Sequence, residues 1–160
     1  MTTEKKQEFF DAVRSNDLDR TRALLRSDRS LANARILGDA TLLNEQVWRN
    51  KTIVNVEPGE KRDTPALHHA VFHSNLEMAK LLLEHGADVH AIGYENNHEM
   101  TPAVVLAAWE GGVDMLRLLL EYGADPNARS GNGVTPISTA LRHRKMDRVE
   151  MLKRYGAIAC

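Results

Sequence analysis

The stretch that decides the fold is LLLEHGADVHA at residues 81–91, which recurs as LLLEYGADPNA at residues 118–128. A degraded copy, MLKRYGA, occupies residues 151–157, and residues 24–34 hold an upstream copy without the glycine. The three copies that contain the glycine thus begin at positions 81, 118 and 151, which are similarly spaced. A period of roughly 35 residues indicates a chain of stacked units, each of which buries its apolar face only against its neighbours.

Each copy that contains the glycine follows a second shared element at a constant distance. This element reads TPALHHA at residues 64–70, TPAVVLA at residues 101–107 and TPISTA at residues 135–140. The interval from its last alanine to the glycine is identical in all three units, in the pairs Ala70 and Gly86, Ala107 and Gly123, and Ala140 and Gly156. Repeated rigid units predict such a fixed internal spacing.

The residue types predict two helices in each unit. A threonine near a helix start can accept a hydrogen bond from an unpaired backbone N–H, and a proline in the first turn costs no backbone hydrogen bond. Leu76, Ala79, Leu82 and Leu83 follow helical spacing, which predicts the second helix. We expect this helix to end at Gly86, because glycine suits the left-handed conformation found after many helices.

These elements resemble the ankyrin repeat, whose hallmarks are a Thr-Pro-Leu-His-x-Ala element, a leucine run and Gly-Ala-Asp-Val-Asn-Ala. The resemblance covers about two thirds of the chain in four units, residues 8–34, 64–91, 101–129 and 135–157. It implies a mainly α fold: an ankyrin-repeat solenoid of stacked helix-turn-helix pairs with β-hairpin fingers and a concave face, forming a single domain over residues 1–160. It also implies that His68, at the position of the motif histidine, bonds between neighbouring fingers.

The sequence departs from this pattern in its linkers. The segment that connects Asn127 of one unit to Ala140 of the next has the normal length, whereas the segment from Asn33 to Ala70 is far longer. The first finger, residues 35–63, therefore holds a long insertion. The segment from His90 to Ala107 is only slightly longer than normal, which gives the second finger a short insertion. In both middle units the Thr-Pro pair also lies one place early relative to the alanine, so we expect a local adjustment of the helix start.

The inserted first finger is apolar enough to be ordered. Residues 52–56 are β-branched except for Asn55 and are followed by Pro58-Gly59, which predicts a strand. Its partner is either a strand at residues 42–48 or a segment that instead starts a helix after Asp39. We expect an extended finger that folds against the array or against a partner.

Composition and charge exclude several classes of protein. The 160 residues include 21 basic and 22 acidic side chains, so the formal charge of -1 provides no broad positive field for nucleic acid. Cys160 is the only cysteine, which rules out a disulfide framework and suits a reducing compartment. The N-terminus runs from residues 1–6 through Phe9 and Phe10 into charged residues, so we expect neither a secretory signal nor a membrane span there. We therefore expect a soluble cytoplasmic protein, monomeric rather than self-associating, that holds no cofactor.

By the resemblance, an ankyrin unit recognises its partner through the two residues after the Ala-Ala of its first helix and through its finger tips. In this sequence the helix positions are Arg14 and Ser15, Phe72 and His73, Trp109 and Glu110, and Arg142 and His143. The finger residues are Trp48 and Tyr94. Aromatic side chains and arginine supply much of the binding energy of protein interfaces, so we expect these residues to hold a protein partner. The alternative is that single exposed aromatics have no such role.

A rival interpretation is a small-molecule site or a small enzyme, with a pocket between the inserted finger and the concave face. His69, His73, Glu110 and His143 would then provide the acid and the base. No nucleophile elbow, phosphate-binding glycine loop, HExxH or CxxC motif is present, so we assign no catalytic residue and favour a protein without enzyme activity.

Two further patterns receive structural interpretations. His69 and His73 have the i, i+4 spacing of a metal clamp, but the third ligand would have to be His98, Glu99 or Glu110 and nothing fixes that geometry, so we assign no metal site. Residues 142–145 with Arg148 form a basic cluster, which we interpret as a solvated face at the end of the array.

Overall fold

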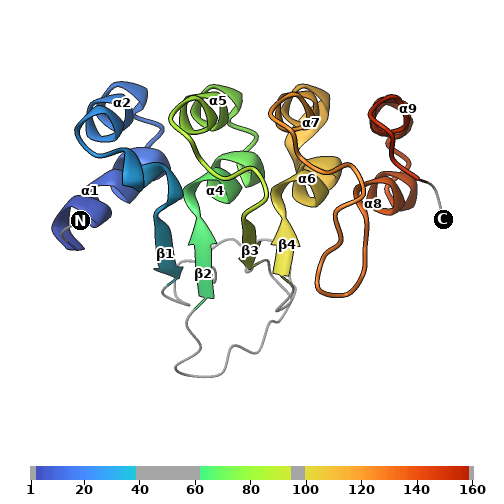
Figure 1. Ribbon diagram of the computed structural model, residues 1–160, viewed down its shortest axis with the longest axis horizontal. Helices are drawn as coiled ribbons and strands as arrows, with labels where there is room; N and C mark the ends of the chain where they lie inside the picture. Colours follow the sequence, from blue (N-terminus) through green and yellow to red (C-terminus); the bar gives the residue numbers. More distant parts are fainter. Residues whose placement is uncertain (1–2, 39–61, 95–99, 159–160) are drawn as a thin grey trace.

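Four helix pairs stand side by side in the computed structural model, which describes residues 3–38, 62–94 and 100–158. Figure 1 shows the first helices of the pairs in one row and the second helices in a parallel row. Unit 1 contains α1 (Thr3–Arg14) and α2 (Leu18–Ser27), followed by the 3-10 helix η1 (Arg29–Asn33). Unit 2 contains α4 (Ala66–Phe72) and α5 (Leu76–Glu84), and unit 4 contains α8 (Pro136–Arg142) and α9 (Met146–Arg154). In unit 3, α6 (Ala103–Leu106) continues into a π-helix, η2 (Ala107–Gly111), which is followed by α7 (Gly112–Glu121). The mainly α solenoid is confirmed.

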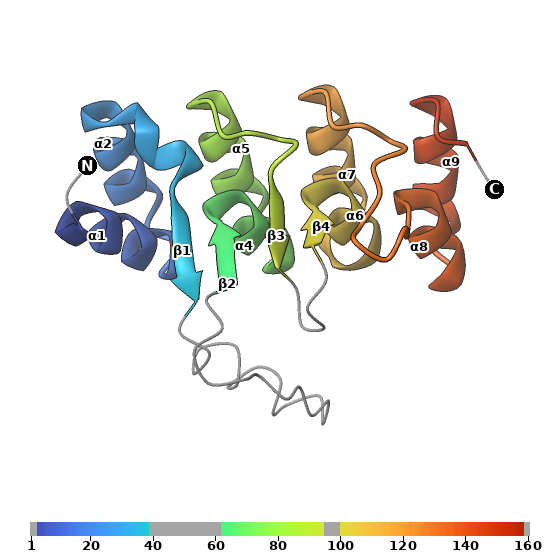
Figure 2. The same ribbon diagram turned by 60° about the horizontal axis from the view of Figure 1, so that its bottom comes forward.

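The strands form two antiparallel hairpin bases that project from the helix layers. β1 (Arg35–Gly38) pairs with β2 (Arg62–Pro65), and β3 (Ile92–Tyr94) pairs with β4 (Met100–Pro102). Both views show β2 and β3 as neighbours, so the two hairpins lie next to each other along the array (Figures 1 and 2). The strand and helix alternatives for residues 42–56 lie outside the described residues.

The core consists of thin layers between the helices. Ala70, Ala107 and Ala140 are at most 1% exposed, because each lies where the helices of adjacent units approach closely. Leu82, Leu119 and Leu152, at equivalent positions of the second helices, are 0% exposed. Small and aliphatic side chains fill such layers, which explains why a chain with 5% aromatic residues can form a continuous core.

Helix starts differ between the units as the displaced Thr-Pro pairs predict. In unit 4, the hydroxyl of Thr135 accepts a hydrogen bond from the Ser138 N–H and the hydroxyl of Ser138 accepts one from the Thr135 N–H, which forms a capping box. In units 2 and 3, Pro65 and Pro102 occupy the N-cap in extended conformation, without a side-chain cap. The threonines before them belong to β2 and β4 instead.

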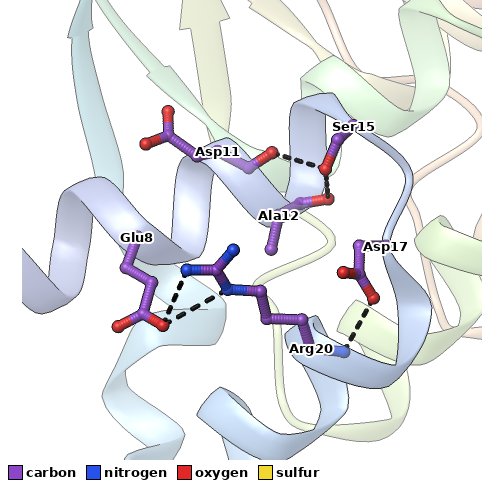
Figure 3. A network of polar contacts seen from close by, with 6 residues as sticks. All are labelled: Glu8, Asp11, Ala12, Ser15, Asp17 and Arg20. Carbon is purple, nitrogen blue, oxygen red and sulfur yellow. Dashed lines mark hydrogen bonds and ion pairs between the residues drawn. The ribbon is translucent and has the colours of Figure 1, made fainter.

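Unit 1 differs from the predicted boundary and lacks the glycine of the other units. Its first helix begins at Thr3, ahead of residue 8 where the resemblance places the start of the unit. Figure 3 shows how its turn is held: the Ser15 hydroxyl donates to the carbonyl oxygens of Asp11 and Ala12, and the Asp17 carboxylate caps α2 at 2.9 Å from the Arg20 nitrogen. The Arg20 guanidinium also binds Glu8 of α1, which joins the two helices.

The second helices of the other units end at glycines in the left-handed region, as expected. Gly86, Gly123 and Gly156 have φ angles of +89°, +88° and +86°. Their backbone conformation, rather than a lack of space, requires glycine, since a Cβ at any of the three would meet nothing within 4 Å.

Asparagine side chains tie the loop of one unit to the next. The Asn33 amide donates to the Gly86 carbonyl at 2.9 Å and its oxygen accepts from the Asp88 N–H at 2.6 Å. Asn127 makes the same pair of bonds with Gly156 and Ile158, at 3.1 and 2.8 Å. His90 holds the equivalent position between units 2 and 3, and its ring makes no hydrogen bond among the described residues. This junction therefore lacks the tie.

Replacing His90 by asparagine should stabilise the junction between units 2 and 3. Two new hydrogen bonds, to Gly123 and Asp125, should raise the free energy of unfolding by about 1 to 2 kcal/mol. Urea denaturation measures the change. The matched control is Asn127→Ala, which removes an existing tie and should lower the free energy of unfolding by a similar amount. If His90→Asn and Asn127→Ala were both less stable than the parent, the junction between units 2 and 3 would not accept the asparagine hydrogen bonds.

Candidate functional site

The residues at the helix positions predicted for recognition lie at corresponding places in successive units. Phe72 and Arg142 are the last residues of α4 and α8, and Trp109 lies in η2. Phe72 and Trp109 are half-buried and pack against the core, so each ring is partly core material and only partly exposed. The remaining members are exposed: Arg14, Ser15, His73, Glu110, Arg142 and His143. We call Phe72, His73, Trp109, Glu110, Arg142 and His143 the recognition row.

Ring contacts divide the recognition row into two aromatic groups. In unit 2, His73 stands edge-on to Phe72 with ring centroids 5.3 Å apart, and lies 4.3 Å from His69. Between units 3 and 4, Trp109 stacks on His143 with centroids 5.7 Å apart and planes 24° apart. The second group joins two units, so its shape depends on the way unit 4 packs against unit 3.

Hydrogen bonds between the turns hold the units in register behind the recognition row. The Asn75 amide of unit 2 donates to the Asn16 side chain of unit 1. The Ser74 hydroxyl donates to the Glu110 carbonyl of unit 3 at 3.2 Å. Because these bonds and the core fix neighbouring turns relative to each other, the row is presented on rigid elements, which lowers the entropy cost of binding.

Arg148 of α9 makes the corresponding connection between units 4 and 3. Its Nη1 donates to the carbonyl oxygens of Ala107 at 3.3 Å, Ala108 at 2.9 Å and Trp109, all in η2. The side chain is only 8% exposed. Arg148 is thus a buried helix cap, and its interpretation as part of a solvated face is wrong. An alignment of the units indicates that this position is buried, because units 2 and 3 have Met78 and Met115 there and both are buried.

The π-helix that Arg148 contacts sets the turn of unit 3 apart from the turns of the other units. In units 1, 2 and 4, the turn after the first helix contains a left-handed residue: Asn16, Ser74 or Arg144. In unit 3 the equivalent Gly111 stays in the right-handed region and Gly112 takes the positive φ of +80°, one residue later. The wider turn of a π-helix keeps Gly111 helical within the same number of residues, and three of its carbonyl oxygens accept hydrogen bonds from the Arg148 guanidinium.

Burial lowers the pKa of His69 and of His73 in unit 2. Burial of His69, together with repulsion of its proton by the neighbouring His73 and Arg14, lowers the pKa of this ring to about 4. Burial also lowers the pKa of His73. A general base works best with a pKa near the operating pH. His69 therefore does not fit the acid-base role that the rival interpretation gives it.

A family model for ankyrin repeats matches residues 9–130 in three copies, which is more than half of the chain. The chain belongs to the ankyrin repeat family. A segment of 53 residues is also 47% identical to the potassium channel AKT3 of Oryza sativa subsp. japonica, and this likeness covers 33% of the present chain and 6% of the channel. Ankyrin repeats indicate a protein-interaction module, because stacked units create an extended binding surface.

The structure of this ankyrin array does not describe the side chains of the two finger residues predicted for binding. Trp48 lies outside the described residues, as do the possible metal ligands His98 and Glu99; Tyr94 ends β3, and its side chain also lies outside them. Within the described ranges, no group of three or more His, Cys, Asp or Glu side chains could hold a metal ion. None of the described helices is long and apolar enough to cross a membrane.

A cavity of about 210 Å³ opens at the base of the first finger, between units 1 and 2 of the ankyrin array. Its lining residues are Ala32, Asn33, Arg35, Pro65, Leu67, Ala87, Asp88 and Ala91. None of them belongs to the recognition row or to the acid-base residues of the rival interpretation. The cavity therefore gives that interpretation no support.

Proposed function

We propose that this ankyrin array binds one protein partner through the recognition row and the inserted first finger. The observation that carries the proposal is the alignment of Phe72 and Trp109 in successive units, each half-buried with an exposed ionisable neighbour. A half-buried aromatic ring is already fixed by the core, so a partner that covers its free edge gains apolar contact without ordering the ring. His73 and Glu110 beside the rings would supply polar contacts.

The recognition row can be tested without knowing the partner in advance. Phe72→Ala with Trp109→Ala should remove most of the bound protein that the parent chain captures from a lysate of its source, as quantified by mass spectrometry. The matched control is Tyr122→Ala with Tyr155→Ala, because these tyrosines are 40% and 41% exposed at the ends of the second helices. The control should capture the same proteins as the parent. Equal capture by both double variants would refute the role of the row.

The first finger requires a separate variant. Residues 40–60 can be replaced by a short glycine-containing turn between β1 and β2, whose pairing from Arg35 and Pro65 to Gly38 and Arg62 would stay intact. We expect weaker capture of the partner by a variant that still unfolds in one cooperative transition. Full capture would restrict the binding surface to the recognition row.

A further inference from the structure

We infer that the partner segment is acidic and that it binds the recognition row at the end where units 3 and 4 lie. This inference rests on the proposed function and adds the chemistry and the orientation of the partner. It is carried by three exposed basic side chains beside the Trp109 and His143 stack: Arg142, Arg144 and Lys145. We call these three residues the basic turn.

The charges of the basic turn are not neutralised by any carboxylate in the part of the chain that the structure describes. Among the described residues, Arg142, Arg144 and Lys145 form no ion pair. The nearby acidic residues have other partners: Glu150 pairs with Arg154, and the Asp147 carboxylate accepts a hydrogen bond from the Arg148 N–H. Residues 142–148 hold four basic side chains and one acidic side chain, so the local excess of positive charge is left for a partner.

Unit 1, at the opposite end of the array, has three arginines that form ion pairs. In unit 1, Arg14 pairs with Asp11 at 3.5 Å, Arg20 with Glu8 at 3.0 Å and Arg22 with Asp19 at 3.2 Å. These arginines are compensated by carboxylates of their own unit. Residues 3–34 hold seven basic and six acidic side chains, whereas residues 135–157 hold six basic and two acidic ones. An acidic segment is therefore attracted to unit 4 rather than to unit 1, which gives the bound partner a direction along the array.

The stack next to the basic turn provides an apolar contact of fixed shape. Trp109 is half-buried, His143 covers one face of its ring, and Arg148 holds the backbone of η2 from the core side. The exposed Leu141 and Met146, at 44% and 63%, adjoin the basic turn in the sequence. The surface thus combines basic and apolar groups, which suits a segment in which acidic residues alternate with aliphatic or aromatic ones.

Glu110 sets a limit on where the acidic residues can bind. Its exposed carboxylate lies next to Trp109 in the recognition row and would repel an acidic group placed over unit 3. The acidic residues of the partner should therefore lie beyond Trp109, over unit 4. An apolar residue of the partner would then contact the stack itself.

Selection from a library of random dodecapeptides displayed on phage tests the inference on the full chain. Peptides that bind should be enriched in Asp and Glu next to an aliphatic or aromatic residue. Charge reversal with Arg142→Glu, Arg144→Glu and Lys145→Glu should weaken their binding by roughly 10-fold or more at low salt, because each exposed pair contributes modestly and the effects combine. Raising the salt concentration should weaken binding to the parent chain in the same direction.

The control keeps the same change in net charge away from the row. Lys6→Glu with Arg26→Glu and Arg29→Glu reverses three charges in α1, α2 and η1, and should leave the binding of the selected peptides close to that of the parent. An equal loss in this control would show that net charge alone, rather than the basic turn, attracts the peptides, and would overturn the inference.

The remaining outcomes separate the inference from the proposed function. Peptides that lose binding to Phe72→Ala with Trp109→Ala, but show no acidic enrichment and bind the charge-reversed turn, would overturn the acidic partner and leave the recognition row in place. Peptides that bind the Phe72→Ala and Trp109→Ala variant as well as the parent would overturn the proposed function too. A selection without any binder above an unrelated control protein would count against both.

Discussion

The free energy of unfolding should fall by roughly 3 kcal/mol between pH 7 and pH 4 because of His68 alone, since one pKa unit corresponds to about 1.4 kcal/mol. Burial lowers the pKa of His68 to about 4 from an ordinary value of 6.5. Between these values the unfolded chain binds a proton that the folded chain does not, so acid favours unfolding. The stabilising contribution is complete above pH 6.5 and is lost as the pH falls toward 4.

The surroundings of His68 explain why the folded protein rejects the proton. The ring is 3% exposed, and its Nε2 lies 2.8 Å from the Thr101 carbonyl oxygen. Because a carbonyl oxygen only accepts, Nε2 carries the hydrogen, and the Nδ1 atom of the neutral ring has no partner among the described residues. A proton on Nδ1 would create a buried charge without an acceptor. Gly93 packs directly against the ring, since a Cβ at this residue would lie only 2.6 Å from the Cδ2 atom of His68.

Urea denaturation of the parent and of His68→Gln across this pH range measures the effect. Glutamine can still donate a hydrogen bond but does not titrate, so the free energy of unfolding should fall less steeply toward acid in the variant. Asn127→Ala is the control: it is destabilised but keeps His68, and should retain the parental slope. NMR titration of the His68 ring gives a second measurement. A parental slope in His68→Gln, or a ring that titrates near pH 6.5, would contradict the assignment.

Most of the repeat architecture follows from the sequence because it depends on spacing. The constant interval from Ala140 to Gly156, shared by the other two units with a glycine, fixes the distance between a close helix contact and a left-handed helix end. Both features depend on local residue types, alanine and glycine, that have few substitutes. The displaced Thr-Pro pairs are also visible in the sequence, and Pro65 and Pro102 show their consequence at the N-caps.

The candidate site was less predictable, since it depends on burial and on contacts between units. The spacing of His69 and His73 correctly predicts a shared helix face, but not the burial that lowers the pKa of both rings. Likewise, the sequence places Trp109 on the recognition row without revealing that His143 of the next unit stacks on it. Arg148 lies within a run of charges, and only comparison with Met78 and Met115 indicates that it is buried.

Replacement of Arg148 by methionine should lower the free energy of unfolding by about 2 to 3 kcal/mol, because the hydrogen bonds from a charged, buried donor to three carbonyl oxygens of η2 are lost. Methionine is the residue that units 2 and 3 carry at this position, as Met78 and Met115, so apolar packing should be largely kept. The matched control is Arg154→Met on the same helix. Its exposed pair with Glu150 should contribute less than about 1 kcal/mol.

The Arg148→Met variant should also change the environment of Trp109. This second measurement distinguishes a side chain that caps η2 from one that only packs against it. Arg148 bonds the carbonyl oxygens of Ala107, Ala108 and Trp109, so its loss frees the end of η2 to shorten by one residue and to move Trp109 relative to His143. Tryptophan emission measured in a Trp48→Phe background reports Trp109 alone, because the chain has two tryptophans. We expect a shifted or more intense emission in Arg148→Met and none in Arg154→Met. If both variants matched the parent in emission and in stability, the π-helix would not depend on Arg148, and the stack could not owe its shape to unit 4.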